Sequence, residues 1–250
     1  MRHDDREIGS VGDLLTALRE LSVPRELLWF RGHSRKDWTL VPSLARTADH
    51  LGKETEIIKR FIQLAVPHLT GDAPRDDWEW IFLMQHHRVP TRLLDWTESP
   101  LAALWFAVSS SDADDLANDG AFWCLAPLSL NQEARFRGRL QTELPGFGKD
   151  DVLDSWLPDR QDRGLRQNPV AATGPRTSPR MAAQLGNFTI SDRGSVAIEE
   201  IGEKEHVWRF IIPVTAKPTI AEELKLLRFT ELTLFPDLDR VATMTRELLS

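Results

Sequence analysis

The sequence predicts an α+β domain in which short strands pack with helices. Segments with apolar residues at helical spacing and short apolar or alternating segments follow one another in mixed order, without the regular alternation of a doubly wound sheet. The chain has 250 residues, of which 41% are hydrophobic, so we expect one domain over residues 1–250 with a substantial core. The sequence contains no internal repeat and no low-complexity tract.

The first third of the chain predicts helices around one strand. Ser10 begins an S-x-x-D helix start, and the leucines that follow recur at helical spacing until Pro24. Residues 27–31 are mostly apolar and are followed by glycine, which predicts a strand that stops there. Further helices are expected at 57–65 and at 78–84, the second of which follows two aspartates placed where the helix dipole favours negative charge.

Residues 85–108, QHHRVPTRLLDWTESPLAALWFAV, combine the most unusual local choices. Pro90 lacks a donor and belongs at the start of a strand, which predicts a short buried strand at 91–96. Ser99 stands where an N-cap belongs and Pro100 at the first helical position, so a buried helix should follow. Polar side chains at such a turn lie near free backbone N–H groups, a common setting for anionic ligands.

The second half of the chain is less regular. Strands are expected at 120–127, 181–190, 207–214 and 231–235, and helices at 220–227 and 238–248. Residues 131–180 carry scattered prolines and charges, so we expect a mobile insertion or loop there. Within it, residues 166–180 hold three arginines and no acid, which is typical of a surface loop and also fits a loop that contacts phosphate.

Charge and cysteine content limit the class of protein. The net charge is 31 − 38 = −7, so any contact with nucleic acid needs a local basic patch. The single cysteine, Cys124, excludes an internal disulfide and a cysteine-based zinc cage, and its apolar flanks predict a buried position. The start lacks the apolar segment of a signal peptide, and no run approaches about 18 apolar residues, so we expect a cytoplasmic protein with no membrane partner.

The fingerprints of several enzyme classes are absent. The sequence has no P-loop, no G-x-G-x-x-G and no G-x-S-x-G. His86 and His87 with Asp95 offer metal-ligand types, but adjacent histidines on one element point apart, so a metal site is disfavoured. What remains is a set of separated polar residues near the expected strand ends: Arg31, Thr97, Ser99, Gln184 and Glu231.

Each of these residues also has a structural alternative. Arg31 can form an ion pair at the edge of its strand, although the neighbouring glycine allows a ligand or another backbone to approach. Thr97 and Ser99 can serve as caps alone. Glu231 can be an exposed residue on an edge strand.

The chain resembles the FRG domain family, which is named for the triplet that stands here as Phe30-Arg31-Gly32. The resemblance covers nearly the whole chain in order. Its blocks are FRGHSRKDWTLVPSLAR at 30–46, LMQHHRVPTRLLDWTESPLAALWFAV at 83–108, RMAAQLGNFTI at 180–190 and TELTLFPDLDRVA at 230–242. Arg88 departs from the family pattern, which usually has glycine there, and Phe229 stands in a place usually given to Gly-Ile.

The family pattern in turn is similar to ADP-ribosyltransferases, which implies their α+β fold. In that fold an arginine or histidine ends the first strand, a serine/threonine turn precedes a helix, and a glutamate lies on a late strand. Arg31 matches the first position and residues 95–99 match the second. Glu231 is the acid in a matching late motif, but Gln184 occupies a place that can align instead.

The resemblance implies an NAD-dependent ADP-ribosyltransferase, with NAD as substrate, that modifies RNA or DNA in a toxin or anti-phage system and has an antitoxin or chaperone partner. The alternatives are a non-catalytic nucleotide- or nucleic-acid-binding module and an NAD glycohydrolase. The expected catalytic residues are Glu231 and Arg31. The expected NAD-binding residues are Arg31, Gly32, His33, Gln85, His86, Arg92, Asp95, Thr97, Ser99 and Gln184.

Overall fold

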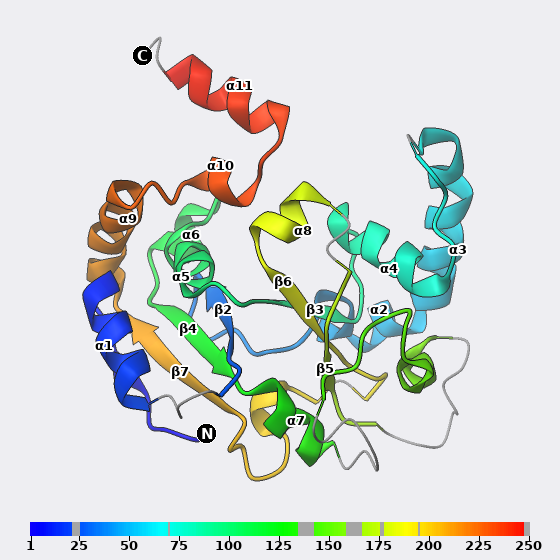
Figure 1. Cartoon of the computed structure of the whole chain (residues 1–250), viewed down its shortest axis with the longest axis horizontal. Helices are drawn as coiled ribbons and strands as arrows, with labels where there is room; N and C mark the ends of the chain where they lie inside the picture. The colour runs from blue at the N-terminus through cyan, green and yellow to red at the C-terminus, as the bar shows by residue number, and fades with distance from the viewer. Residues whose placement is uncertain are drawn as a thin grey trace.

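A seven-stranded sheet organises the chain in the computed structural model (Figure 1). The structure describes residues 1–21, 26–69, 71–134, 143–158, 167–175, 178–194 and 196–247. The strand order is β1-β7-β4-β2-β3-β6-β5, and neighbouring strands are antiparallel except for the pair β1 and β7. The fold is therefore α+β with a mostly antiparallel sheet, as the mixed order of elements predicts.

The strands are β1 (Arg6–Glu7), β2 (Trp29–His33), β3 (Leu93–Thr97), β4 (Gly120–Leu125), β5 (Val170–Ala172), β6 (Gly186–Ile190) and β7 (Val207–Ile212). The helices are α1 (Val11–Leu21), α2 (Ala48–Gly52), α3 (Glu54–Ala65), α4 (Asp77–His86), α5 (Pro100–Val108), α6 (Ala113–Leu116), α7 (Pro127–Glu133), α8 (Pro179–Ala183), α9 (Lys217–Leu226), α10 (Glu231–Leu234) and α11 (Leu238–Glu247). Short 3-10 helices are η1 (Ser43–Arg46), η2 (Val66–His68), η4 (Asp151–Trp156), η5 (Ile198–Glu200) and η6 (Val214–Ala216).

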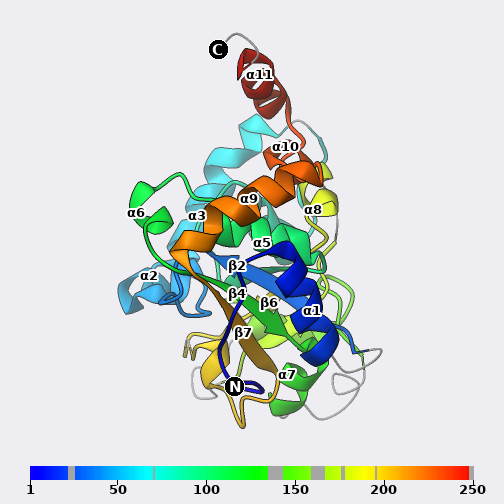
Figure 2. The same cartoon turned by 90° about the vertical axis from the view of Figure 1, so that its left-hand side faces the viewer.

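Helices α1, α5 and α9 cover one face of the half of the sheet that contains β7, β4 and β2 (Figures 1 and 2). Leu14 of α1, Leu104 of α5 and Leu224 of α9 are buried against Phe122 and Phe210 of the strands. The other half of the sheet packs against α4 and η4, where buried aromatic and aliphatic side chains form a second cluster. The helices that cover the sheet therefore change between β2 and β3.

Gly32 allows α5 to lie directly against β2. A Cβ at this position would overlap the carbonyl oxygen of Ala103 and lie 2.5 Å from the backbone nitrogen of Ala107. Both obstructing atoms belong to the backbone of α5, so they cannot turn aside as a side chain can. The glycine that follows Arg31 therefore serves the approach of another backbone.

Gly32→Ala is expected to destabilise the protein by about 3 kcal/mol or more, because the new methyl group must push a buried helix off the sheet. Gly52→Ala is the matched control, since a Cβ there meets nothing within 4 Å and alanine is the better helix former. Urea unfolding of both variants measures the difference. Equal midpoints for the two variants would show that α5 does not rest on β2 as described.

Most of the predicted elements are confirmed, with small shifts at their ends. The helix expected after Ser99 runs from Pro100 to Val108, and the Ser99 Oγ accepts a hydrogen bond from the Ala102 N–H at 3.2 Å. Cys124 is buried in β4, and burial raises the pKa of its thiol well above the ordinary value. The strand expected at 27–31 instead spans Trp29–His33 and continues through the glycine.

The strand predicted at 231–235 is wrong, and the strand predicted at 181–190 is confirmed only over its second half. Residues 231–234 form α10 because Thr230 and Thr233 close a capping box, with the Thr230 N–H donating to the Thr233 Oγ1 at 3.1 Å. The first half of 181–190 belongs to α8, which Ser178 caps and Pro179 begins, and only Gly186–Ile190 is a strand.

The region expected to be a loop, 131–180, contains regular structure where it is described. Leu153 and Trp156 of η4 are buried in the core, and β5 pairs with β6 along Val170–Ala172. Residues 135–142, 159–166 and 176–177 lie outside the described residues. The scattered prolines and charges of this region predicted a loop, although it contains the buried edge strand β5.

Candidate functional site

The sheet is split between β2 and β3. β2 pairs with β4 along its whole length, and β3 pairs with β6 along its whole length, but β2 and β3 pair only at Phe30 and Thr97. Beyond that pair the two strands separate. The Nη1 of Arg31 reaches across the opening and donates to the backbone carbonyl oxygen of Asp95 at 2.6 Å.

A pocket of about 190 Å³ opens at this split. Its lining includes Phe30 and Arg31 from β2, and Asp95, Trp96 and Thr97 from β3. Because successive side chains on a strand point to opposite faces, residues next to each other in sequence cannot all line a pocket on one face of the sheet. The pocket therefore lies in the gap between the two strands. Gly32, Ala103, Phe106, Arg180 and Gln184 complete it.

Arg31 is a half-buried cation held by neutral partners. Its Nε donates to the Nε2 of His33 at 2.9 Å, which requires that nitrogen to be an acceptor, so the Nδ1 of His33 carries the proton and donates to the Trp38 carbonyl oxygen at 3.2 Å. Burial, and after it the charge of Arg31, holds the pKa of His33 well below its ordinary value, consistent with a neutral ring. His33 therefore positions the guanidinium.

Arg31 has no carboxylate within ion-pair distance among the described residues. Burial lowers the pKa of its guanidinium, and the nearby charge of Asp95 opposes that shift only in part. Arginine keeps its charge in proteins, so a half-buried guanidinium without an anionic partner favours the binding of an anion.

Asp95 supplies a carboxylate beside this cation. It is exposed in the middle of β3, and its Oδ2 accepts a hydrogen bond from the Gln85 Nε2 at 2.8 Å. The Oε1 of Gln85 in turn accepts a hydrogen bond from the buried Thr91 hydroxyl, which fixes the orientation of the amide. Gln85 therefore orients Asp95 and leaves its other carboxylate oxygen accessible.

The Thr97 turn is held by its own hydrogen bonds. The Thr97 Oγ1 donates to the backbone carbonyl oxygen of Gln184 and accepts from the Ser99 N–H at 2.9 Å. The Gln184 side chain donates from Nε2 to the Leu234 carbonyl oxygen at 3.2 Å. These hydrogen bonds connect β3, α5, α8 and α10 around the pocket.

Arg180 is a second guanidinium in the lining, contributed by α8. It is half-buried, and burial lowers its pKa. Its Cζ lies 4.7 Å from the centre of the Phe235 ring, and no carboxylate pairs with it among the described residues. Of the three arginines in 166–180, this is the one that the structure describes, and it faces the pocket as the phosphate-contacting alternative requires.

The pocket continues along β3 toward α4 through two further hollows. A hollow of about 50 Å³ shares Asp95, Trp96, Arg180 and Gln184 with the first pocket. It shares Phe82, His86 and Met181 with a larger hollow of about 470 Å³. Burial, then the charges of His87 and Arg180, lowers the pKa of His86 at the junction. Ligand pockets are typically about 300–1,000 Å³, so a nucleotide at the split would have to extend from the pocket of about 190 Å³ into the neighbouring hollows.

The structure brings together only part of the set expected from the sequence. Arg31, Gly32, Asp95, Thr97 and Gln184 line the pocket, and Gln85 and His86 line the adjoining hollow. His33 and Ser99 support residues of the site without lining it. Arg180 is the charged lining residue that was not among the expected site residues, and the arginine-rich stretch at 166–180 is the signal that points to it.

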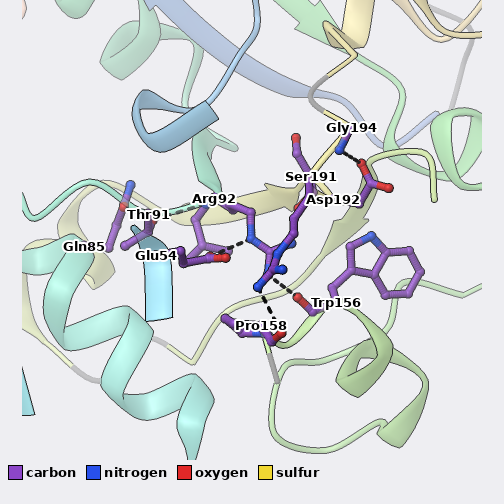
Figure 3. A network of polar contacts seen from close by, with 11 residues as sticks. Glu54, Gln85, Thr91, Arg92, Trp156, Pro158, Ser191, Asp192 and Gly194 are labelled. Carbon is purple, nitrogen blue, oxygen red and sulfur yellow. Dashed lines mark hydrogen bonds and ion pairs between the residues drawn. The ribbon is translucent and has the colours of Figure 1, made fainter. Parts of the chain in front are cut away.

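Arg92 lies apart from the pocket, in a buried network (Figure 3). Its Nε pairs with the Glu54 Oε1 at 2.6 Å, and its other nitrogens donate to the carbonyl oxygens of Ser191 and Trp156. All of its polar groups face protein partners. Arg92 therefore joins α3, β3 and η4.

Glu231 lies on α10, where a late strand was expected. Its Oε1 pairs with the Arg240 Nη1 at 2.7 Å, and 43% of its side chain is exposed. It is not among the residues that line the pocket, where Gln184 and Asp95 stand instead. Its expected catalytic role stays a prediction of the resemblance.

Arg88 has a positive φ of 62°, which explains why a glycine suits this position. Arg228, just before Phe229, has a φ of 59°. The backbone adopts the left-handed conformation at Arg88 and at Arg228 without glycine, at a cost of about 1 kcal/mol each.

The described residues contain no cluster of three or more metal-ligating side chains. Within the same part of the chain, no helix is both long and apolar enough to cross a membrane.

Comparison with known proteins gives a match to one family model over part of the chain. Residues 26–116, which include Arg31, Asp95 and the Thr97 turn, match the model of the FRG domain. No curated protein and no solved structure matches the chain.

Proposed function

We propose, from the match of residues 26–116 to the FRG domain model, that the chain is an NAD-dependent ADP-ribosyltransferase whose site is the pocket at the β2–β3 split. The observation that carries the proposal is that one pocket is lined by Arg31, a half-buried guanidinium with no carboxylate within ion-pair distance among the described residues, and by Asp95, whose carboxylate is accessible. A cation that lacks an anion supports binding of a diphosphate, and a nearby carboxylate supports chemistry on the attached sugar.

Transfer of ADP-ribose from NAD requires few catalytic side chains. Cleavage of the nicotinamide–ribose bond of NAD releases neutral nicotinamide, so the leaving group needs no general acid. The transition state resembles an oxocarbenium ion, and a carboxylate that accepts a hydrogen bond from a ribose hydroxyl stabilises its positive charge. The acceptor then bonds to the ribose carbon and loses its proton.

Asp95 is the carboxylate that the pocket offers for this role. Gln184 lies in the lining but is neutral, and Glu231 lies outside the lining in an ion pair. Arg31 would bind the diphosphate, and Trp96 and Phe106 add aromatic surface for the planar ring. The resemblance of the family pattern to ADP-ribosyltransferases supports the role of Arg31, whereas it implies Glu231 as the catalytic acid.

The acceptor and partners follow from the resemblance alone. We propose RNA or DNA as the acceptor, a toxin or anti-phage role in the cytoplasm, and an antitoxin or chaperone as partner. With a net charge of −7, the protein would have to bind nucleic acid through a local basic patch.

The proposal is tested by incubating the purified protein with NAD that is labelled in the adenylate, together with RNA, DNA or cell extract. We expect release of nicotinamide and transfer of label to a macromolecule. Nicotinamide release with free ADP-ribose as the sole labelled product would indicate an NAD glycohydrolase. A folded protein that releases no nicotinamide under any of these conditions would contradict the proposal.

A second candidate is a nucleotide-binding module without catalysis. It is favoured by Gln184, a neutral residue at the place in the pocket where the late motif can align. Saturable NAD binding without nicotinamide release would support this alternative.

A further inference from the structure

Arg180 and Arg31 give the pocket an excess of positive charge. Both guanidinium groups line it, both are half-buried, and neither has a carboxylate within ion-pair distance among the described residues. Asp95 is the acidic residue of the lining, so the lining carries one net positive charge in a protein whose net charge is −7. Desolvating two cations is unfavourable unless a ligand brings negative charge.

The C-terminal segment, residues 230–240, holds Arg180 in place. The ring of Phe235 contacts two cations, with the Cζ of Arg180 at 4.7 Å and that of Arg240 at 5.8 Å from its centre. Phe235 is 8% exposed and packs against Trp105 and Phe106 of α5. A buried aromatic ring therefore provides a fixed platform for Arg180 at the pocket.

Two further contacts secure this platform. The Leu234 carbonyl oxygen accepts a hydrogen bond from Gln184, the residue that ends α8, and Glu231 pairs with Arg240. The charged groups that act on Arg180 are Asp95 on β3, Arg88 after α4, and Asp237 and Arg240 of the C-terminal segment. None of them forms an ion pair with Arg180, so its guanidinium stays available to a ligand.

We propose that Arg180 and Arg31 together bind the diphosphate of a nucleoside diphosphate, and that Phe235 is the positioning residue that keeps Arg180 at the pocket. The Nη2 of Arg31 and the guanidinium of Arg180 have no protein hydrogen-bond partner among the described residues, so the two groups, which lie on separate elements, can each donate to a different phosphate. The inference uses the pocket of the proposed function but does not depend on transfer.

The test is titration calorimetry with ADP, AMP and inorganic pyrophosphate. Wild-type protein is expected to bind ADP more tightly than AMP. Arg180→Gln should weaken ADP binding about 10- to 100-fold while changing AMP binding much less, because it removes the charge-assisted bonds to the second phosphate. Arg60→Gln, on the exposed surface of α3, is the matched control and should change neither affinity.

Phe235→Leu separates positioning from stability. It keeps an apolar side chain against α5 but removes the ring, so we expect the preference for ADP over AMP to fall about tenfold in a protein that still unfolds cooperatively. A purely structural role would lower both affinities alike. Arg180→Lys should retain part of the preference, since the charge remains but the paired donors do not.

The outcomes for pyrophosphate and for catalysis keep the two proposals apart. Pyrophosphate binding equal to that of ADP would show a diphosphate site that does not recognise the nucleoside, which would overturn the nucleotide part of the inference. Nicotinamide release by wild-type protein, combined with unchanged ADP binding by Arg180→Gln, would overturn the proposed diphosphate site of Arg180 and Arg31, here called the clamp. It would leave the proposed transferase activity standing. ADP binding that depends on Arg180, without any nicotinamide release, would overturn the transferase but not the clamp. Absence of ADP binding by folded wild-type protein would overturn the clamp directly.

Discussion

Asp95→Asn is expected to lower the rate of nicotinamide release from NAD about a hundredfold while leaving the dissociation constant of NAD within a few-fold of wild type. The change removes the negative charge that would stabilise the oxocarbenium-like transition state, an interaction that is weak in the ground state. The asparagine keeps the size of the side chain and an oxygen that Gln85 can still reach. Steady-state rates and NAD titrations measure the two effects separately.

Glu231→Gln is the matched comparison, since it also replaces one carboxylate by its amide. Glu231 is partly exposed and pairs with Arg240, so this change should alter the rate less than about threefold and stability by less than about 1 kcal/mol. The reverse pattern, with Glu231→Gln inactive and Asp95→Asn unaffected, would place the catalytic acid on the C-terminal segment, as the family resemblance implies.

Glu54→Ala should have the largest effect on stability, about 3–5 kcal/mol, because it leaves Arg92 buried without its counter-charge. Glu54 and Arg92 are 5% and 3% exposed, so water does not replace the lost partner. Figure 3 shows how the Arg92 side chain points toward Glu54 and Trp156 from the start of β3. The free energy of unfolding in urea gives the magnitude.

Glu56→Ala provides the control for this measurement, because Glu56 lies exposed on the same helix and should change stability by less than about 0.5 kcal/mol. Removing both charges in the double variant Glu54→Leu, Arg92→Met should recover most of the lost stability. An apolar pair leaves no buried charge without a partner and has no cost of charge desolvation. A loss below about 1 kcal/mol in Glu54→Ala would show that the pair is not buried as described.

Local signals in the sequence predict the elements that carry them. Ser99 and Pro100 mark the start of α5, and the helix begins there. The same pair, Ser178 and Pro179, starts α8, but the apolar residues that follow were interpreted as a strand. In a run of five residues the helical and strand periods differ too little to decide, so the capping residues were the better guide.

The same ambiguity affected residues 231–235. Leu232 and Leu234 alternate as in a strand, yet the capping threonines at 230 and 233 close a helical turn. The expected late strand with an acid on it therefore does not form, and Glu231 lies outside the pocket lining. The assignment of Glu231 as the catalytic acid assumed a strand at 231–235, and the chain forms the helix α10 there instead.

Contacts with residues distant in sequence decide which of the expected site residues line the pocket. Arg92 stands in the polar stretch that was expected to bind NAD, but Glu54, 38 residues away, engages its guanidinium. Arg31 and Asp95 were both expected at the site, and the structure adds that the split between their strands places them at one pocket. Arg180 could be suspected only from an arginine-rich stretch, because its partner Phe235 comes from the far end of the chain.

The most direct test of the site is a calorimetric titration of NAD into wild-type protein and into Arg31→Gln, with thermal unfolding of both as a check on folding. We expect saturable binding to the wild type and at least about tenfold weaker binding to the variant, because the loss of a charge-assisted contact to phosphate lowers affinity by that order. Equal affinity of the two folded proteins for NAD would contradict a nucleotide site at the β2–β3 split.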